Sequence, residues 1–309
     1  MPAPDRSTTR RVSSLVRSPV TDQPLRLLLI QARSKPRMVE QEQQCFVERC
    51  RAPQEQFRIL NVGRGDTPSP SSLDGIDAVF IGGAGQYSAT EDYEWTAPLL
   101  ALVRRIVDEE RPLFGSCWGH QIIARALGGR VVYAPDRSEL GCGWVELTDA
   151  GHNDPLFHRF PHRFRANMGH HDRVVELPPN AVELARNDQR NQAFRLKDAP
   201  VYGTQFHSEL DAERERERIL VYLEHYRDAL PDEETVERVL DSLADTTEVD
   251  HLMYDFLTTF VARGQDLPSP VELAAPAPSD GMAAVQAEAA APTARRIPEE
   301  HDPPPPSTD

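Results

Sequence analysis

Residues 112–129 read PLFGSCWGHQIIARALGG, an apolar run that passes through a cysteine into an amphipathic segment. Residues 112–116 predict a strand, and 118–127 predict a helix that Gly128 and Gly129 close at its C-cap. Cys117 therefore stands at a strand-to-helix junction, with a glycine two residues away on each side. This spacing is typical of a tight elbow, because glycines leave room for strained backbone angles and the side chain projects above the sheet.

The same junction favours a reactive thiol. The following helix points its N-terminus at the sulfur, which stabilises the thiolate. The N–H group of Trp118 is among the unpaired donors of the first helical turn, so it can donate to an oxyanion. A small buried hydrophobe remains the competing interpretation of Cys117 at this stage.

The surrounding chain predicts an α/β fold. Apolar runs at 25–32, 57–62 and 77–83 predict strands, and 37–52 and 94–109 predict helices. After residue 129 a series of short β-type runs follows: RVVYA, GWVELT, FRANM, RVVELP, AVELAR, AFRL and VYGTQF. This order indicates a mostly parallel central sheet flanked by helices, with ligands bound beyond the carboxyl ends of the strands.

The ends of the chain differ from its middle in composition. Residues 1–24 are rich in Ser, Thr, Arg and Pro, and residues 263–309 are rich in Pro and Ala, so both are expected to be disordered tails. Acidic helices are predicted at 211–228 and 232–262, with a break near 245. Their charged positions are expected to be mostly solvated. The apolar positions of both stretches suggest a packed edge, and 232–262 is expected to dock on a partner or a second copy of the chain.

Composition excludes several classes of protein. The formal net charge is −15, from 34 Lys and Arg against 49 Asp and Glu, which argues against nucleic-acid binding. No apolar run approaches the ~20 residues of a membrane-spanning helix. The four cysteines form no CxxC pair, so a reducing cytoplasm is expected and a disulfide framework is not. His152, His158 and His162 lie in an irregular segment without a carboxylate cluster, and neither a metal site nor a cofactor is expected.

Residues 202–209, YGTQFHSE, predict a strand that runs into a turn. Residues i and i+2 of an extended chain project to the same side, so Glu209 can hold one ring nitrogen of His207. The other nitrogen is then free to face the Cys117 sulfur. This arrangement supplies a nucleophile, a base and a group that orients the base.

A glycine-rich turn follows the strand at 77–83, where residues 81–88 read IGGAGQYS. Its N–H groups could complete an oxyanion hole. No Walker lysine follows the turn, which disfavours a nucleotide site.

Together with MGHHDRVVELP at 168–178, these motifs resemble the class I, triad-type glutamine amidotransferases, most closely the glutaminase domain of GMP synthases. The resemblance implies a flavodoxin-like domain at 25–228, extended by acidic helices at 229–262. It also implies that Cys117, His207 and Glu209 form the catalytic triad. Residues implied to form the oxyanion hole or to bind substrate are Gly83, Gly85, Trp118, Gln121, Gly169, His170, His171 and Asp172.

The activity implied by the resemblance is hydrolysis of L-glutamine to glutamate and ammonia through a γ-glutamyl thioester on Cys117. The chain shows no ATP-pyrophosphatase loop, so a partner synthase or ligase is expected to use the ammonia. Two alternatives stay open: a γ-glutamyl peptidase or hydrolase with the same triad, and a catalytically silent regulator or scaffold. The oligomeric state is not predicted.

Overall fold

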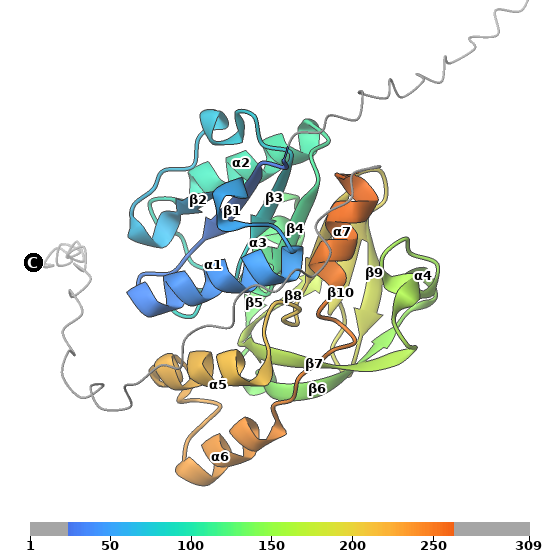
Figure 1. Ribbon diagram of the computed structural model, residues 1–309. Helices are drawn as coiled ribbons and strands as arrows, with labels where there is room; N and C mark the ends of the chain where they lie inside the picture. Colours follow the sequence, from blue (N-terminus) through green and yellow to red (C-terminus); the bar gives the residue numbers. More distant parts are fainter. Residues whose placement is uncertain (1–23, 263–309) are drawn as a thin grey trace, which may run out of the picture. The chain divides into compact units, whose positions relative to one another are not determined.

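The computed structural model describes residues 24–262, so the predicted tails lie outside the described residues except for Pro24. Strands and helices alternate over the first half of this range, as the sequence predicts (Figure 1). The helices are α1 (Pro36–Cys50), α2 (Thr96–Asp108), α3 (Trp118–Ala126), α4 (Asp149–His152), α5 (Ala212–Val221), α6 (Glu233–Ser242) and α7 (Leu252–Phe260). The strands are β1 (Leu27–Gln31), β2 (Phe57–Asn61), β3 (Ala78–Ile81), β4 (Leu113–Ser116), β5 (Arg130–Tyr133), β6 (Glu139–Leu147), β7 (Arg163–His170), β8 (Asp172–Glu176), β9 (Ala181–Arg186), β10 (Ala193–Leu196) and β11 (Val201–Thr204).

The main sheet has the strand order β2-β1-β3-β4-β11-β10-β9-β6-β7. Its first five strands are parallel to their neighbours, whereas β10, β9, β6 and β7 are added in antiparallel fashion. Strands β5 and β8 form a separate antiparallel pair. The predicted α/β class with a parallel central sheet is therefore confirmed, and the β-rich second half extends that sheet on one side.

Helices cover both faces of the parallel part. Leu27 and Leu29 of β1 belong to the core beneath α1 and α7, while Leu28 and Ile30 belong to the core beneath α2 and α3. Successive side chains of a strand point to opposite faces, so a strand covered on both sides is apolar throughout. All five residues of β1 are buried, and its one polar residue, Gln31, donates a hydrogen bond to Glu42 at 2.9 Å.

The C-terminal helices pack onto this chain, so the expectation that 232–262 docks on a partner or a second copy is wrong for α7. Leu252, Phe256 and Leu257 are fully buried in the same core as α1. The Phe256 ring centroid lies 5.9 Å from that of Phe80 on β3 and 5.6 Å from that of Phe114 on β4. Helix α7 therefore completes the cover of one sheet face. Leu240 of α6 packs similarly in a smaller cluster with residues of α5 and the turn after it.

The helices in the described part of the chain are short, and α1 reaches 15 residues. Between residues 24 and 262, none has both the length and the apolar character that crossing a membrane requires.

Candidate active site

Cys117 lies in a strained elbow between β4 and α3. Its backbone angles are φ 51° and ψ −101°, in a region that residues with a Cβ rarely adopt. A Cβ on Gly115 would lie 2.5 Å from the backbone carbon of Gly119, and one on Gly119 would lie 2.2 Å from the carbonyl oxygen of Ile81. The two glycines are thus required by close backbone contact, and they let α3 start directly against β3.

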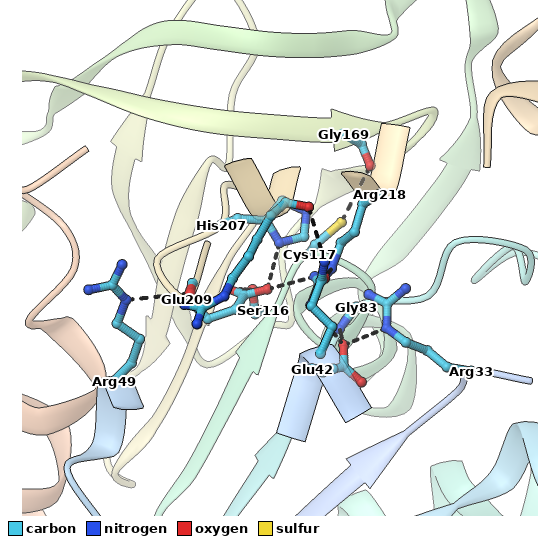
Figure 2. Close-up of polar contacts among 12 residues, drawn as sticks. Arg33, Glu42, Arg49, Gly83, Ser116, Cys117, Gly169, His207, Glu209 and Arg218 are labelled. Carbon is cyan, nitrogen blue, oxygen red and sulfur yellow. Dashed lines mark hydrogen bonds and ion pairs between the residues drawn. The ribbon is translucent and has the colours of Figure 1, made fainter. Parts of the chain in front are cut away.

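A hydrogen-bonded network orients the imidazole beside this elbow (Figure 2). The backbone N–H of His207 donates to the carbonyl of Asn167 at 2.9 Å, and the ring Nδ1 lies 2.7 Å from Glu209 Oε1. The other carboxylate oxygen accepts a hydrogen bond from Ser116 Oγ at 2.7 Å, and Arg218 Nη1 lies 3.3 Å from Oε1. Glu209 therefore fixes the ring and ties it to the end of β4, one residue before Cys117.

Burial makes the electrostatics of this network strong. Burial alone lowers the pKa of His207, but the carboxylate of Glu209 and then the thiol of Cys117 raise it well above its ordinary value. Burial raises the pKa of Glu209, yet the imidazole of His207 and the guanidinium of Arg218 hold it far below its ordinary value. The geometry thus favours an imidazolium beside an ionised carboxylate.

Two backbone segments were predicted to stabilise an oxyanion. Trp118 is the first residue of α3, so its N–H has no earlier helical carbonyl to bond and remains available next to the sulfur. The N–H of Gly83 instead donates to Oε1 of the buried Glu42 at 3.1 Å, and Arg33 Nε donates to the same oxygen at 2.8 Å. The oxyanion role of Gly83 stays a prediction, and it requires this N–H to leave Glu42.

A cavity of about 330 Å³ opens beside the thiol. The predicted residues that line it are Gly85, Cys117, Trp118, Gln121, Gly169, His170, His171 and Asp172. Tyr87, Glu91, Tyr133, His225 and Tyr226 complete much of the wall. Gly83, His207 and Glu209 do not line this cavity. The structure therefore brings the predicted substrate residues together around the thiol. The imidazole of His207 lines a second, smaller cavity that Cys117 also borders.

Asp172 is the centre of the polar contacts in this wall. One of its carboxylate oxygens, Oδ2, accepts hydrogen bonds from Ser88 Oγ at 2.7 Å and from the N–H of Ala89 at 2.6 Å. Its carbonyl accepts one from Gln121 Nε2 at 2.7 Å. The buried Oδ1 has no hydrogen-bond partner within residues 24–262. This oxygen is a free acceptor beside the cavity, and burial raises the pKa of the carboxyl group.

The two histidines of this wall are held by other groups. His170 Nε2 lies 3.3 Å from Glu139, and its Nδ1 lies 3.0 Å from the carbonyl of Asp172. The His171 Nε2 lies 2.9 Å from the carbonyl of His225. Both rings therefore shape the wall.

As for metals, the described part of the chain holds no cluster of three or more His, Cys, Asp or Glu side chains that could bind an ion. His152 and His162 lie elsewhere, as a stacked pair.

Several buried charged residues near Cys117 and His207 were not predicted from the sequence. Arg33, Glu42, Glu215 and Arg218 are all at most 5% exposed. The charged positions of 211–228 were expected to be mostly solvated, which is wrong for Glu215 and Arg218 on the inner face of α5. Positions 215, 218, 219 and 222 follow helical spacing, so the apolar Ile219 and Tyr222 mark the inner face. That spacing alone does not show which charged residues beside an apolar face are buried.

Comparison with known proteins gives a consistent assignment. A family model described as glutamine amidotransferase class-I matches residues 48–222. A glutamine-hydrolyzing GMP synthase subunit of Pyrococcus abyssi is 30% identical over 165 residues, which cover 53% of this chain and 85% of that protein. The Methanopyrus kandleri protein of the same name is 38% identical over 111 residues, or 35% of this chain and 58% of that one. Gamma-glutamyl peptidase 4 of Arabidopsis thaliana is 31% identical over 147 residues, or 47% of this chain and 58% of that one.

Solved structures share the fold. A glutamine amidotransferase from Thermotoga maritima superposes with a TM-score of 0.60 at 23% identity, covering 77% of this chain and 98% of that one. One from Methylobacillus flagellatus gives a TM-score of 0.59 at 22% identity, covering 79% and 98%. The family model spans more than half of the chain, and its residues include the cysteine elbow and the His207–Glu209 pair. The protein belongs to the class I glutamine amidotransferase family.

Proposed function

We propose that the protein is a glutaminase that hydrolyses L-glutamine to glutamate and ammonia through a γ-glutamyl thioester on Cys117. The observation that carries this proposal is the strained cysteine elbow with a buried, carboxylate-oriented imidazole beside it. A nucleophile, a base and an orienting group in this order constitute a catalytic triad.

In the first half of the reaction, the Cys117 thiolate attacks the side-chain carbonyl carbon of glutamine. Negative charge develops on the carbonyl oxygen, and the N–H of Trp118 at the start of α3 is placed to stabilise it. His207 gives its proton to the departing nitrogen as the C–N bond breaks, and ammonia leaves. The raised pKa of His207 supports this step, because the ring carries the proton that it must donate.

In the second half, neutral His207 takes a proton from water, whose oxygen attacks the thioester carbon. The C–S bond then breaks, so glutamate is released and the Cys117 thiolate is restored. Glu209 stays ionised throughout and stabilises each imidazolium that forms.

Substrate recognition is assigned to the wall of the large cavity. Asp172 Oδ1 is an unpaired acceptor there, suited to an α-ammonium group. Gln121 and Gly169 border the thiol, and Gly169 presents a carbonyl 3.9 Å from the sulfur. The ammonia is proposed to pass to a partner synthase, as the names of the two GMP synthase relatives suggest. A reducing cytoplasm suits the four free cysteines, Cys117 among them.

A γ-glutamyl peptidase is the second candidate, and the shape of the cavity favours it. The cavity extends from Cys117 to Glu91 and to Tyr133, which is 53% exposed. A cavity of about 330 Å³ has room for a γ-glutamyl substrate larger than glutamine. The Arabidopsis relative named as a gamma-glutamyl peptidase is consistent with this alternative.

The test is thiol labelling by a glutamine-analogue electrophile, combined with assays of ammonia release. Cys117→Ala should abolish both labelling and ammonia release while leaving the fold intact. Cys142→Ala, which removes a half-exposed thiol on β6, is the matched control and should change neither. Protection by glutamine supports the glutaminase, and protection by γ-glutamyl peptides alone supports the peptidase. Wild-type ammonia release from Cys117→Ala would refute the assignment, and no selective labelling would indicate a silent scaffold.

A further inference from the structure

Helix α5 buries one carboxylate that has no use in the triad. Glu215 is 2% exposed, and its Oε2 has no hydrogen-bond partner within residues 24–262. The flanking glutamates differ, since Glu213 is exposed and Glu217 bonds to Gln41 at 2.7 Å. A buried polar group without a partner is costly, so its retention indicates a ligand that the carboxylate binds.

Glu215 lines a second, smaller cavity, of about 20 Å³, which is room for one water-sized molecule. The cavity also borders Cys117 and His207. Its lining residues include three further buried polar atoms that make no hydrogen bond within residues 24–262, namely Arg33 Nη1, Arg218 Nη2 and Tyr222 Oη. Of these, Arg218 Nη2 lies 3.9 Å from Glu42 Oε1. Hydrogen-bond donors and an acceptor therefore surround a space of molecular size next to the nucleophile.

The two cavities differ in which proposed catalytic side chains line them. Cys117 lines both, whereas His207 lines only the smaller one. In the proposed reaction, the same imidazole protonates the departing ammonia and deprotonates the attacking water, so both molecules must pass beside it. The large cavity then holds the γ-glutamyl group, and the small one holds the leaving and entering molecules.

We propose that Glu215 is a positioning residue that holds the hydrolytic water beside His207, in the place that ammonia leaves. This inference rests on the proposed function. The water donates one hydrogen to Glu215 Oε2 and its other proton to His207. Its oxygen attacks the thioester carbon, after which the C–S bond breaks and Cys117 leaves as the thiolate. The Glu215 carboxylate also contributes to the raised pKa of His207.

The experiment compares wild type, Glu215→Gln and Glu213→Gln with glutamine as the substrate. The glutamine-analogue electrophile is the separate probe of Cys117, because its reaction needs no water. Glu215→Gln should be labelled at the wild-type rate. Its kcat should fall roughly 10- to 100-fold, the range that a misplaced reactant costs. KM should fall in the same proportion, since deacylation becomes slower and kcat/KM reports only the steps up to acylation.

Intact-protein mass spectrometry should then show the γ-glutamyl adduct accumulating on Glu215→Gln during turnover, and not on the exposed control Glu213→Gln. A kcat within about twofold of wild type, or a loss of kcat/KM without adduct, would overturn the proposal. Should Glu215→Gln fail to fold, Tyr222→Phe removes one lining hydroxyl and should also slow deacylation; unchanged deacylation there would overturn it. A wild type that neither is labelled nor forms an adduct would instead refute the glutaminase itself.

Discussion

Replacing Glu209 by glutamine tests the buried charge at the centre of the site. The carboxylate is fully buried and meets His207 and Ser116 at 2.7 Å each and Arg218 at 3.3 Å. Removing one partner of a buried ion pair costs about 3–5 kcal/mol. Glutamine can keep its oxygen toward His207 and Arg218 and offer its amide to Ser116 Oγ, so we expect the lower end, about 3 kcal/mol, at pH 6.

The pH dependence follows from the shifted pKa values. Because the pKa of Glu209 is lowered in the folded state, its stabilisation is present above the ordinary value of 4.5 and is lost as pH falls. Because the pKa of His207 is raised, the stabilisation of the imidazolium is present below 6.5 and is lost as pH rises. The difference between wild type and Glu209→Gln should therefore be greatest between pH 4.5 and 6.5. This difference in unfolding free energy should narrow by about 1.4 kcal/mol from about pH 6 to about pH 3.5. One proton contributes about 1.4 kcal/mol per pH unit, and about one unit of this range lies below the ordinary pKa of 4.5.

The assay is urea unfolding at a series of pH values and fixed ionic strength, with glutaminase kcat measured in parallel. We expect kcat to fall by roughly 10²- to 10⁴-fold, because the base loses its orienting charge. Ser116→Ala is the control, since it removes one hydrogen bond and keeps the titrating carboxylate, so its stability offset should hardly change with pH. A Glu209→Gln difference that stays constant from about pH 6 to about pH 3.5 would refute an ionised Glu209 with a depressed pKa.

Two further substitutions test the scaffold. Gly119→Ala places a Cβ 2.2 Å from the carbonyl oxygen of Ile81, so we expect a loss of about 1–3 kcal/mol in thermal or urea unfolding and a large loss of glutaminase activity. The control is Gly143→Ala, whose Cβ would lie 3.5 Å from its nearest atom, so it should change neither the stability nor the activity. Equal losses in the two variants would contradict the close-contact argument. Phe256→Ala empties a fully buried site in α7 and should cost about 3–5 kcal/mol. The half-buried Tyr254→Ala, on the same helix, should cost far less, and a mild Phe256→Ala would show that α7 is not part of the core.

Much of the fold could be predicted from local pattern. The apolar run of β1 and the amphipathic period of α3 each reflect a neighbourhood of a few residues, and both elements formed within a few residues of the expected bounds. Helix α7 is different. Its apolar residues were read as a surface for a partner, because periodicity shows that a face is apolar but not what covers it. The sheet face of β3 and β4 covers it here.

The sequence by itself determined the elbow around Cys117 and the pairing of His207 with Glu209. Both depend on spacings of two residues, and backbone geometry fixes such short distances. Only the tertiary structure decided which of the alternating charges in 213–218 are buried. Glu213, Glu215 and Glu217 have the same chemistry and similar neighbours in sequence, yet packing of α5 against the site buries Glu215 alone among them. The hydrogen bond from the N–H of Gly83 to Glu42 likewise depends on the tertiary structure, because it joins residues 41 positions apart in the chain.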